Sequence, residues 1–447
     1  MESKNKMGNL GWSGNYENVF AACKDVFSIN PHTGKVYMKS DKEYWNNLVD
    51  VIIKNVRGIG ERETFNSENA QSGLRFLIPY SGGKTSELKY IYPNLPSYDR
   101  YFEPFVGGGS VFMGINANEY YINDFSSDLI TLYRNIASLN RNFCHYAELI
   151  DMTIKKAIQF RDNKLDILLD IHKRYRTGIL TDVTLDKEIS SFCKTHSSEI
   201  NEITNIFPSL PSTLLQEMRK SLYKIIQDMN KSRKMVQDKV SEYFLTAIQK
   251  SLYIHYRNLF NNKELKETNP VLYSTIFLYI RERVFRGGSN YNQKGELNSS
   301  YNGYKHNYRL LTDTLDYYHS APVMEHFRDA HIYNMDFEDF LQETNPTEND
   351  FIFLDPPYDE TISTYHGNEF NQDDHRRLAN YLLNDCKAKW MMIIKKTDFI
   401  FNLYNKKGIY MKTYNKTYNS GTKKGKLNTH LLITNYPPKS ETYRRAA

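Results

Sequence analysis

A carboxylate followed by two prolines and an aromatic ring closes an apolar run at residues 353–358, Phe-Leu-Asp-Pro-Pro-Tyr. An amine conjugated to a purine ring is a poor nucleophile because its lone pair is delocalised, and hydrogen bonds accepted from its protons localise that pair. Asp355 and the carbonyl of Pro356 are suited to accept these bonds, and Tyr358 is suited to stack on the base. Pro357 has no N–H donor, which leaves carbonyls of the turn to a substrate. A tight turn after a buried strand, without chemistry, is the alternative.

A glycine-rich turn stands between two strand-like runs near residue 100. Residues 101–105 are typical of a strand, residues 106–110 of a turn, and residues 111–113 of the apolar start of a helix. A second strand at 120–122 ends close to Asp124. Strand, glycine turn, helix, strand and acidic residue is the order of a nucleotide-binding α/β unit.

The glycines and the acidic residue suit different parts of a nucleotide-like ligand. Gly107 and Gly109 would let the backbone approach the ligand, and the helix start would supply amide donors. Asp124 would accept hydrogen bonds from two ribose hydroxyls. A plain glycine turn, and a helix N-cap at Asp124, are the structural alternatives.

The elements that position these residues are predicted from periodicity. Residues 126–285 show helical spacing of apolar residues, and clustered glycine and asparagine after residue 286 predict an exposed hairpin or loop. Further strands are expected at 331–333, 351–354, 390–394 and 430–434, with a helix over 372–386. The pattern predicts an α/β fold: a Rossmann-like sheet over 71–140 and 325–447, a mostly helical insertion over 141–324, and an unassigned stretch over 1–70.

Composition narrows the function classes only modestly. The formal charge of +6, the 35 tyrosines and the 24 phenylalanines are compatible with a polyanionic, base-containing partner. The four cysteines form no Cys-x-x-Cys pair, which argues against a zinc site. No apolar run approaches a membrane span, and no signal core follows the polar start, so a cytoplasmic location is expected.

Five blocks together resemble the Dam-like (D12 class) adenine-specific DNA methyltransferases, whose hallmark is Asp-Pro-Pro-Tyr. Pro79-Tyr80-Ser81-Gly82-Gly83-Lys84 resembles the family's amino-terminal cofactor motif. The other blocks, in the family's order, are residues 102–112 for the glycine motif, 123–130 for the acidic block and 334–337 for the adenine-binding pair. The resemblance covers residues 75–140 and 250–436.

The resemblance implies a methyltransferase sheet with an inserted target-recognition domain, S-adenosylmethionine as cofactor, and methylation of adenine N6. The substrate would be double-stranded DNA with the target base flipped out, without a metal or a covalent intermediate. The implied cofactor residues are Tyr80, Lys84, Phe105, Gly107, Gly109, Asp124, Asp336, Phe337 and Asp355. The implied catalytic residues are Asp355, Pro356 and Tyr358, and the implied base pocket is Tyr358, Tyr365 and Lys84.

Each of these assignments has a structural alternative. Asp336 would accept the cofactor's adenine amine while Phe337 covers its ring, or Phe337 is simply part of the core. Lys84 would line the pocket, or it is a solvated residue of a Ser-Gly-Gly turn. Lysines over 406–426, interleaved with tyrosines, would bind phosphates or form a solvated loop.

The resemblance implies that a hairpin near 286–304 recognises the DNA target sequence. Asn290, Asn292, Gln293 and Lys294 would reach base edges, or the hairpin is only solvated. Asn290 stands where Dam-type enzymes tend to carry arginine, and two serines at 299–300 replace the usual Val-Pro, so a GATC target is not implied. A cognate restriction endonuclease is an expected partner. An amine methyltransferase acting on RNA or protein, or a DNA-binding protein with a vestigial fold, are the competing hypotheses.

Overall fold

The computed structural model divides the chain into two units, Met1–Glu61 and Arg62–Ala447. The structure describes residues 27–29, 36–38, 63–80, 82–207, 209–231, 239–285, 288, 291–359, 370–418, 426–438 and 444–445. In the first unit, β1 (Phe27–Ile29) and β2 (Val36–Met38) form an antiparallel pair. The site residues predicted from the sequence all belong to the second unit.

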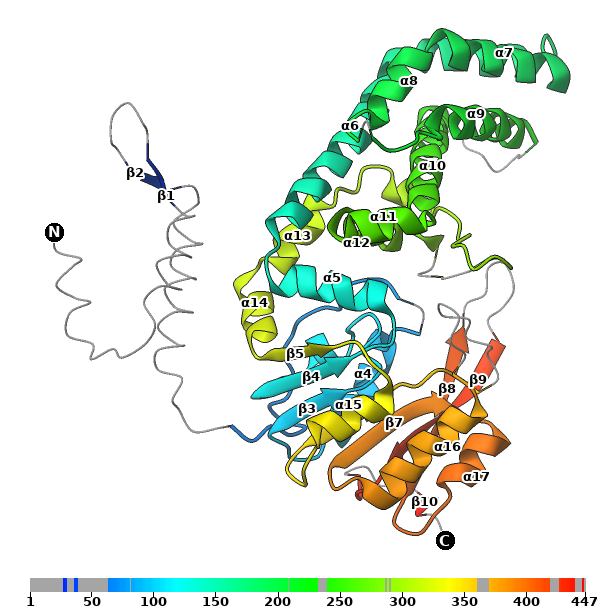
Figure 1. Cartoon of the computed structure of the whole chain (residues 1–447). Helices are drawn as coiled ribbons and strands as arrows, with labels where there is room; N and C mark the ends of the chain where they lie inside the picture. The colour runs from blue at the N-terminus through cyan, green and yellow to red at the C-terminus, as the bar shows by residue number, and fades with distance from the viewer. Residues whose placement is uncertain are drawn as a thin grey trace. The chain divides into compact units, whose positions relative to one another are not determined.

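The second unit is built on one mixed sheet with the strand order β10-β8-β9-β7-β6-β3-β4-β5 (Figure 1). The parallel strands are β3 (Arg100–Glu103), β4 (Glu119–Asn123), β5 (Ala330–Tyr333), β6 (Phe351–Leu354) and β7 (Lys389–Lys395). The antiparallel edge comprises β9 (Lys426–Thr434), β8 (Tyr410–Tyr418) and the two-residue β10 (Arg444–Arg445). The strand order reverses between β3 and β6, which is where open α/β sheets bind their ligands.

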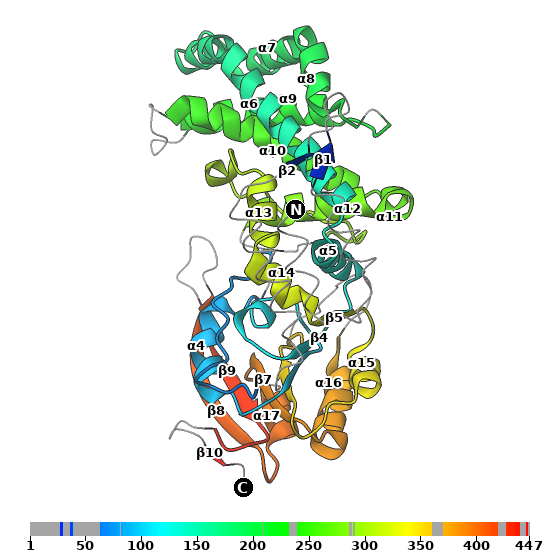
Figure 2. The ribbon, with the colours of Figure 1, turned by 90° about the vertical axis from the view of Figure 1, so that its left-hand side faces the viewer.

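The predicted strands occur where the sequence placed them, and burial explains why β6 was recognisable. All four residues of β6 are buried, because helices cover both faces of the sheet. On one face, Phe102, Ile352 and Leu354 pack against α15 (Phe337–Thr344), α16 (Gln372–Asn380) and α17 (Asp398–Tyr404). Figure 2 shows α4 (Leu88–Ile91) on the side of the sheet opposite α15 and α16.

The helix expected directly after the glycine turn is not formed. Residues 112–114 make a single 3₁₀ turn, and the chain is extended again at Ile115 before β4 begins at Glu119. Too few residues separate the turn from the strand for a helix. The helix follows β4 instead, as α5 (Ser127–Ala137), whose first turn is capped by the side chain of Ser126.

A long helical segment leaves the sheet after α5 and returns before β5. It comprises α6 (Arg141–Arg176), α7 (Asp182–Thr195), α8 (Ser197–Thr204), α9 (Leu214–Lys231), α10 (Val240–Phe260), α11 (Lys263–Thr268), α12 (Pro270–Arg283), α13 (Thr312–Tyr318) and α14 (Ala321–Arg328). Helical spacing therefore predicted the structure of this stretch correctly. No described helix is long and apolar enough to cross a membrane.

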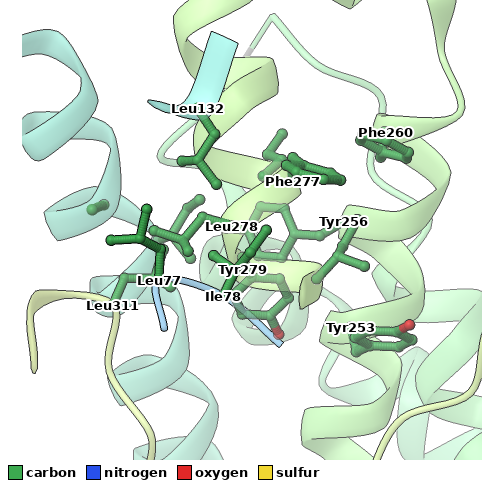
Figure 3. Close-up of a cluster of buried hydrophobic side chains, with 14 of the residues drawn as sticks. Leu77, Ile78, Leu132, Tyr253, Tyr256, Phe260, Phe277, Leu278, Tyr279 and Leu311 are labelled. Atoms are coloured by element: carbon green, nitrogen blue, oxygen red, sulfur yellow. The ribbon is translucent and has the colours of Figure 1, made fainter. Parts of the chain in front are cut away.

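The segment and the sheet share a hydrophobic cluster. Figure 3 shows Leu77 and Ile78, which precede the Lys84 turn, beside Leu132 of α5 and Leu278 of α12. Every residue of α12 from Leu272 to Arg283 is buried. A helix surrounded in this way is a core element, so α12 is held rigidly against the segment that carries the proposed site residues.

Candidate active site

The glycine turn after β3 requires glycine for two different reasons. Gly107 has a left-handed backbone, with φ of +50°, which L side chains rarely adopt. Gly108 has no space for a side chain, because its Cβ would lie 2.7 Å from the carbonyl oxygen of Ile78 and 2.9 Å from Cβ of Tyr80. The turn therefore lies directly against the Ile78–Tyr80 segment.

Asp124, at the end of β4, closes the other side of this turn. Its Oδ2 accepts a hydrogen bond from the Gly107 amide at 3.0 Å, and its Oδ1 accepts one from the Ser126 amide at 2.9 Å. Burial raises the pKa of the Asp124 carboxyl to about 6 despite these two hydrogen bonds. Because Ser126 is the N-cap of α5, the alternative that Asp124 is merely that cap is wrong.

Asn123 joins three loops at the carboxyl edge of the sheet. Its Nδ2 donates to the carbonyls of Pro104, at 3.1 Å, and Met335, at 3.0 Å. Its Oδ1 accepts from the Met335 amide at 3.0 Å. The glycine turn, the end of β4 and the start of α15 are thereby held in one arrangement.

Lys84 and Asp355, separated by 271 residues in the sequence, form an ion pair. The Lys84 ammonium donates to Oδ2 of Asp355 at 2.5 Å and to the Gly82 carbonyl at 2.9 Å. It also lies 6.0 Å from the centre of the Tyr358 ring. Lys84 is only 2% exposed, so the alternative of a solvated turn lysine is wrong.

The charge on Asp355 depends on the groups around it. Burial raises the pKa of its carboxyl, the Lys84 ammonium lowers it, and the negative charge of Glu87 raises it again. About a fifth of the side chain, 21%, is exposed. The side chain is therefore partly accessible to solvent, and Lys84 and Glu87 shift the pKa of its carboxyl in opposite directions.

Glu87 is a residue that sequence reasoning missed. It ends the 3₁₀ turn that follows Lys84, is 1% exposed, and accepts hydrogen bonds from Tyr414 Oη and Lys416 Nζ, both at 2.5 Å. The ring of His430 lies with its Nδ1 3.4 Å from Glu87 Oε1. Burial would raise the pKa of this carboxyl, but the hydrogen bond with His430 and the nearby lysine charges lower it to about 2.

The partners of Glu87 come from β8 and β9, so the antiparallel edge of the sheet also contributes to the site. Tyr414 and Lys416, which the sequence placed in a phosphate-binding or solvated stretch, instead hold a buried carboxylate. The rings of His430 and Tyr358 are perpendicular to each other, with centres 5.7 Å apart. Only the spacing of three residues between Lys84 and Glu87 was visible in the sequence, and such pairs are common on exposed surfaces.

Phe105, Phe337 and Asp336 come from the loop after β3 and the start of α15, which Asn123 holds together. The rings of Phe105 and Phe337 are 5.6 Å apart, and each is also 5.6 Å from Phe370. Phe337 is 4% exposed, so it belongs to the core as well as to the candidate site. Asp336 caps α15 through the Glu338 amide and pairs with Arg377 at 2.7 Å.

The predicted hairpin after α12 is formed by antiparallel bridges between Val284 and Tyr301 and between Tyr291 and Leu297. Asn292 closes its turn, because its Oδ1 accepts from the amides of Lys294 and Glu296 at 2.9 and 3.0 Å. Gln293 and Lys294 are exposed at the tip.

Two of the predicted residues, Asn290 and Tyr365, lie outside the described part of the chain. Within the described ranges, no group of three or more histidine, cysteine or acidic side chains is arranged to hold a metal ion. The structure brings Lys84, Asp355 and Tyr358 into one cluster and Gly107 and Asp124 into an adjacent one.

Comparison with known families identifies the family of the chain. A model of the D12 class N6 adenine-specific DNA methyltransferases matches residues 80–177 and 212–418, more than half of the chain. The chain belongs to this family. The match includes the glycine turn, Asp124 and Asp355, and it resumes in the helical segment that precedes the hairpin.

Relatives of this D12 chain carry names consistent with the family. This chain is 34% identical over 182 residues to the Type II methyltransferase M.CviBI of Paramecium bursaria Chlorella virus NC1A. The aligned stretch covers 39% of this chain and 66% of that protein. It is 23% identical over 325 residues to the DNA N-6-adenine-methyltransferase of Escherichia phage P1, covering 72% and 29% respectively. The Retron Ec67 DNA adenine methylase of Escherichia coli is 22% identical over 322 residues, covering 72% and 77%.

The aligned stretches span less than two thirds of the first two of these relatives. The observed mixed sheet is compatible with a methyltransferase fold, and the family implies a methyl donor and DNA as substrate. The D12 family thus accounts for the order of the predicted blocks, whereas the Glu87 cluster of this chain was found only in the structure.

Proposed function

We propose that this D12 family member is a site-specific adenine methyltransferase that transfers a methyl group from S-adenosylmethionine to N6 of adenine in double-stranded DNA. The observation that carries the proposal is the buried Lys84–Asp355 ion pair beside Tyr358. It joins two family motifs that lie far apart in the sequence, at the point where the strand order reverses.

The residues around the glycine turn fit the cofactor. Asp124, a partly exposed residue, has its carboxylate beside the backbone of Gly107, where ribose hydroxyls would donate to it. The neighbouring rings of Phe105 and Phe337 would bound the adenine, with Asp336 accepting from its amine. Tyr80 and Gly109 would border the methionine part. Once bound, S-adenosylmethionine supplies an electrophilic methyl group.

The residues on the β6 side would prepare the substrate amine. Asp355 and the Pro356 carbonyl would accept hydrogen bonds from the two amine protons, which localises the lone pair on nitrogen. Lys84 would keep Asp355 ionised and correctly oriented. Because burial raises the pKa of Asp355, this carboxylate is also a suitable acceptor for the proton that the methylated amine releases.

A base inside a duplex reaches such a site only by flipping out of the helix. Tyr358 would then stack on the flipped adenine, with Lys84 lining the pocket, and Tyr365 is proposed to close it. Gln293 and Lys294, exposed at the tip of the hairpin, are proposed to reach base edges together with Asn290. Asn292 is engaged within the turn, so its contribution would be to shape the tip.

The proposal is tested by expressing the protein in bacteria that lack adenine methylation and mapping N6-methyladenine in their DNA by single-molecule sequencing. Asp355→Ala is the matched inactive variant, and it should bind DNA while leaving no mark. A wild-type protein that binds cofactor and DNA but leaves no adenine mark would refute the proposal.

A further inference from the structure

The segment from Arg75 to Tyr80 is held on both sides by hydrogen bonds. On one side, the Leu77 amide donates to the carbonyl of Gly108 in the glycine turn at 3.2 Å. On the other side, three alternate carbonyls of the segment accept from side chains of α12 and α13. The Arg75 carbonyl accepts from Tyr317 Oη at 2.5 Å, and the Leu77 carbonyl accepts from Tyr318 Oη at 2.8 Å. The Pro79 carbonyl accepts from Arg281.

Arg281 makes the contact that lies next to the proposed site. Its Nε and Nη2 donate to the Pro79 carbonyl at 3.1 and 2.7 Å, and its guanidinium carbon lies 4.8 Å from the centre of the Tyr80 ring. Arg281 is 2% exposed. Burying a guanidinium is costly unless its bonds and ring contacts are well formed, so this geometry is strongly specified.

Tyr80 has little freedom once Arg281 is in place. The Cβ atom of Tyr80 is so close to Gly108 that a side chain at position 108 would have no space. The ring of Tyr80 borders Gly107. Arg281 covers the ring from the side of α12. Figure 3 shows the residues before Tyr80, Leu77 and Ile78, in the same cluster as Leu278 and Tyr279 of α12. The tyrosine is therefore clamped between the glycine turn and α12.

The helix that carries Arg281 leads straight into the proposed DNA-reading hairpin. The Arg283 carbonyl at its end accepts from the Asn302 amide at 2.9 Å, and the Phe285 amide donates to the Ser300 carbonyl at 2.8 Å. Ser299 is in turn held by Tyr253 of α10, whose hydroxyl donates to its carbonyl at 3.1 Å. One rigid helix thus spans from the hairpin to the segment beside the glycine turn.

We propose that Arg281 is a positioning residue for methyl transfer: it holds Tyr80 against the glycine turn, and so makes the helical insertion a structural part of the cofactor site. The inference rests on the proposed function, because Tyr80 is assigned to the cofactor there. In this proposal Arg281 acts through Tyr80 and is not a catalytic residue.

The test is the affinity for S-adenosylmethionine, measured by calorimetry on full-length protein without DNA. Arg281→Met should weaken binding about tenfold, since binding must then order the Tyr80 side chain that Arg281 holds in the wild type. Arg281→Lys keeps the charge and one donor, so it should recover part of the affinity. Tyr318→Phe is the matched control: it removes one hydrogen bond from the same segment without touching Tyr80, and it should leave affinity within about twofold.

A double-mutant cycle separates positioning from general loosening of the fold. If Arg281 acts through Tyr80, Arg281→Met should add little to the loss caused by Tyr80→Ala. Hydrogen exchange of the unliganded protein gives a second readout, in which the Leu77 amide should exchange faster in Arg281→Met. Additive losses in the cycle, or equal losses in Tyr318→Phe, would overturn the inference. Failure of both Arg281 variants to fold would also overturn it, because the residue would then be structural.

The outcomes distinguish this inference from the proposed function. A wild-type protein that neither binds S-adenosylmethionine nor methylates adenine contradicts the function. A wild-type protein that does both, with unchanged affinity in Arg281→Met, contradicts only the role of Arg281.

Discussion

Replacing Lys84 with methionine removes the counter-ion of Asp355 while keeping most of the side-chain volume. Burial raises the pKa of Asp355 and the Lys84 ammonium lowers it, so the pKa rises when the ammonium is removed. The protonated carboxyl no longer accepts a hydrogen bond from the substrate amine. We therefore expect Lys84→Met to lose activity at neutral pH and to lose more as the pH falls.

The size of the loss follows from the geometry of the pair. Unit charges about 4 Å apart interact by about 4 kcal/mol at an effective dielectric of 20, and by about 1 kcal/mol in water. Here Nζ and Oδ2 are 2.5 Å apart, with side-chain exposures of 3% for Lys84 and 21% for Asp355. The site lies between the two limits, so we take about 2 kcal/mol for the interaction of the pair, which corresponds to a loss of up to about 30-fold in kcat/KM.

The assay is transfer of a labelled methyl group into DNA across the acid and neutral range. With S-adenosylmethionine saturating, so that protonation of Asp124 does not limit the rate, the acid limb of the wild-type profile should report ionisation of Asp355. In Lys84→Met this limb should move to higher pH. Glu87→Gln is the control of opposite sign: it removes a negative charge that raises the pKa of Asp355, so its acid limb should move to lower pH. An unmoved limb in Lys84→Met, in a protein that unfolds like the wild type, would refute this reasoning.

Three other predictions concern binding and stability. Asp124→Asn should weaken cofactor binding about tenfold in calorimetry. The affinity of the wild type should fall as the pH drops through about 6, where the Asp124 carboxyl, whose pKa burial raises, becomes protonated. A wild-type affinity that does not depend on pH would contradict this role of Asp124. Glu87→Gln should reduce the free energy of unfolding at neutral pH by about 3 kcal/mol. Because the pKa of Glu87 is lowered from 4.5 to about 2, this contribution is present above pH 4.5 and lost as the pH falls toward 2; denaturant unfolding at several pH values tests it. In DNA titrations, Gln293→Ala and Lys294→Ala should each relax discrimination at the base pair that the side chain reaches; uniform weakening across all sequences would contradict the assignment.

Where sequence reasoning succeeded, the signal was local. Residues 351–354 form an uninterrupted apolar run because β6 is covered on both faces, and this is visible without any knowledge of the fold. The helix expected to start at 111–113 is not formed, and the reason also lies in the neighbouring residues. An apolar triplet fits both a helix start and a buried 3₁₀ turn, and the early start of β4 at Glu119 decided between them.

The sequence by itself determined the chemistry of individual positions: a carboxylate before two prolines at a strand end, glycines in a turn, and an acidic residue after the next strand. Only the tertiary structure decided which charges meet. Lys84 pairs with Asp355, and Glu87 draws Tyr414 and Lys416 from the antiparallel edge, because strand order brings these segments together. Contacts between residues hundreds of positions apart leave no periodic trace in one sequence, whereas burial and backbone conformation do.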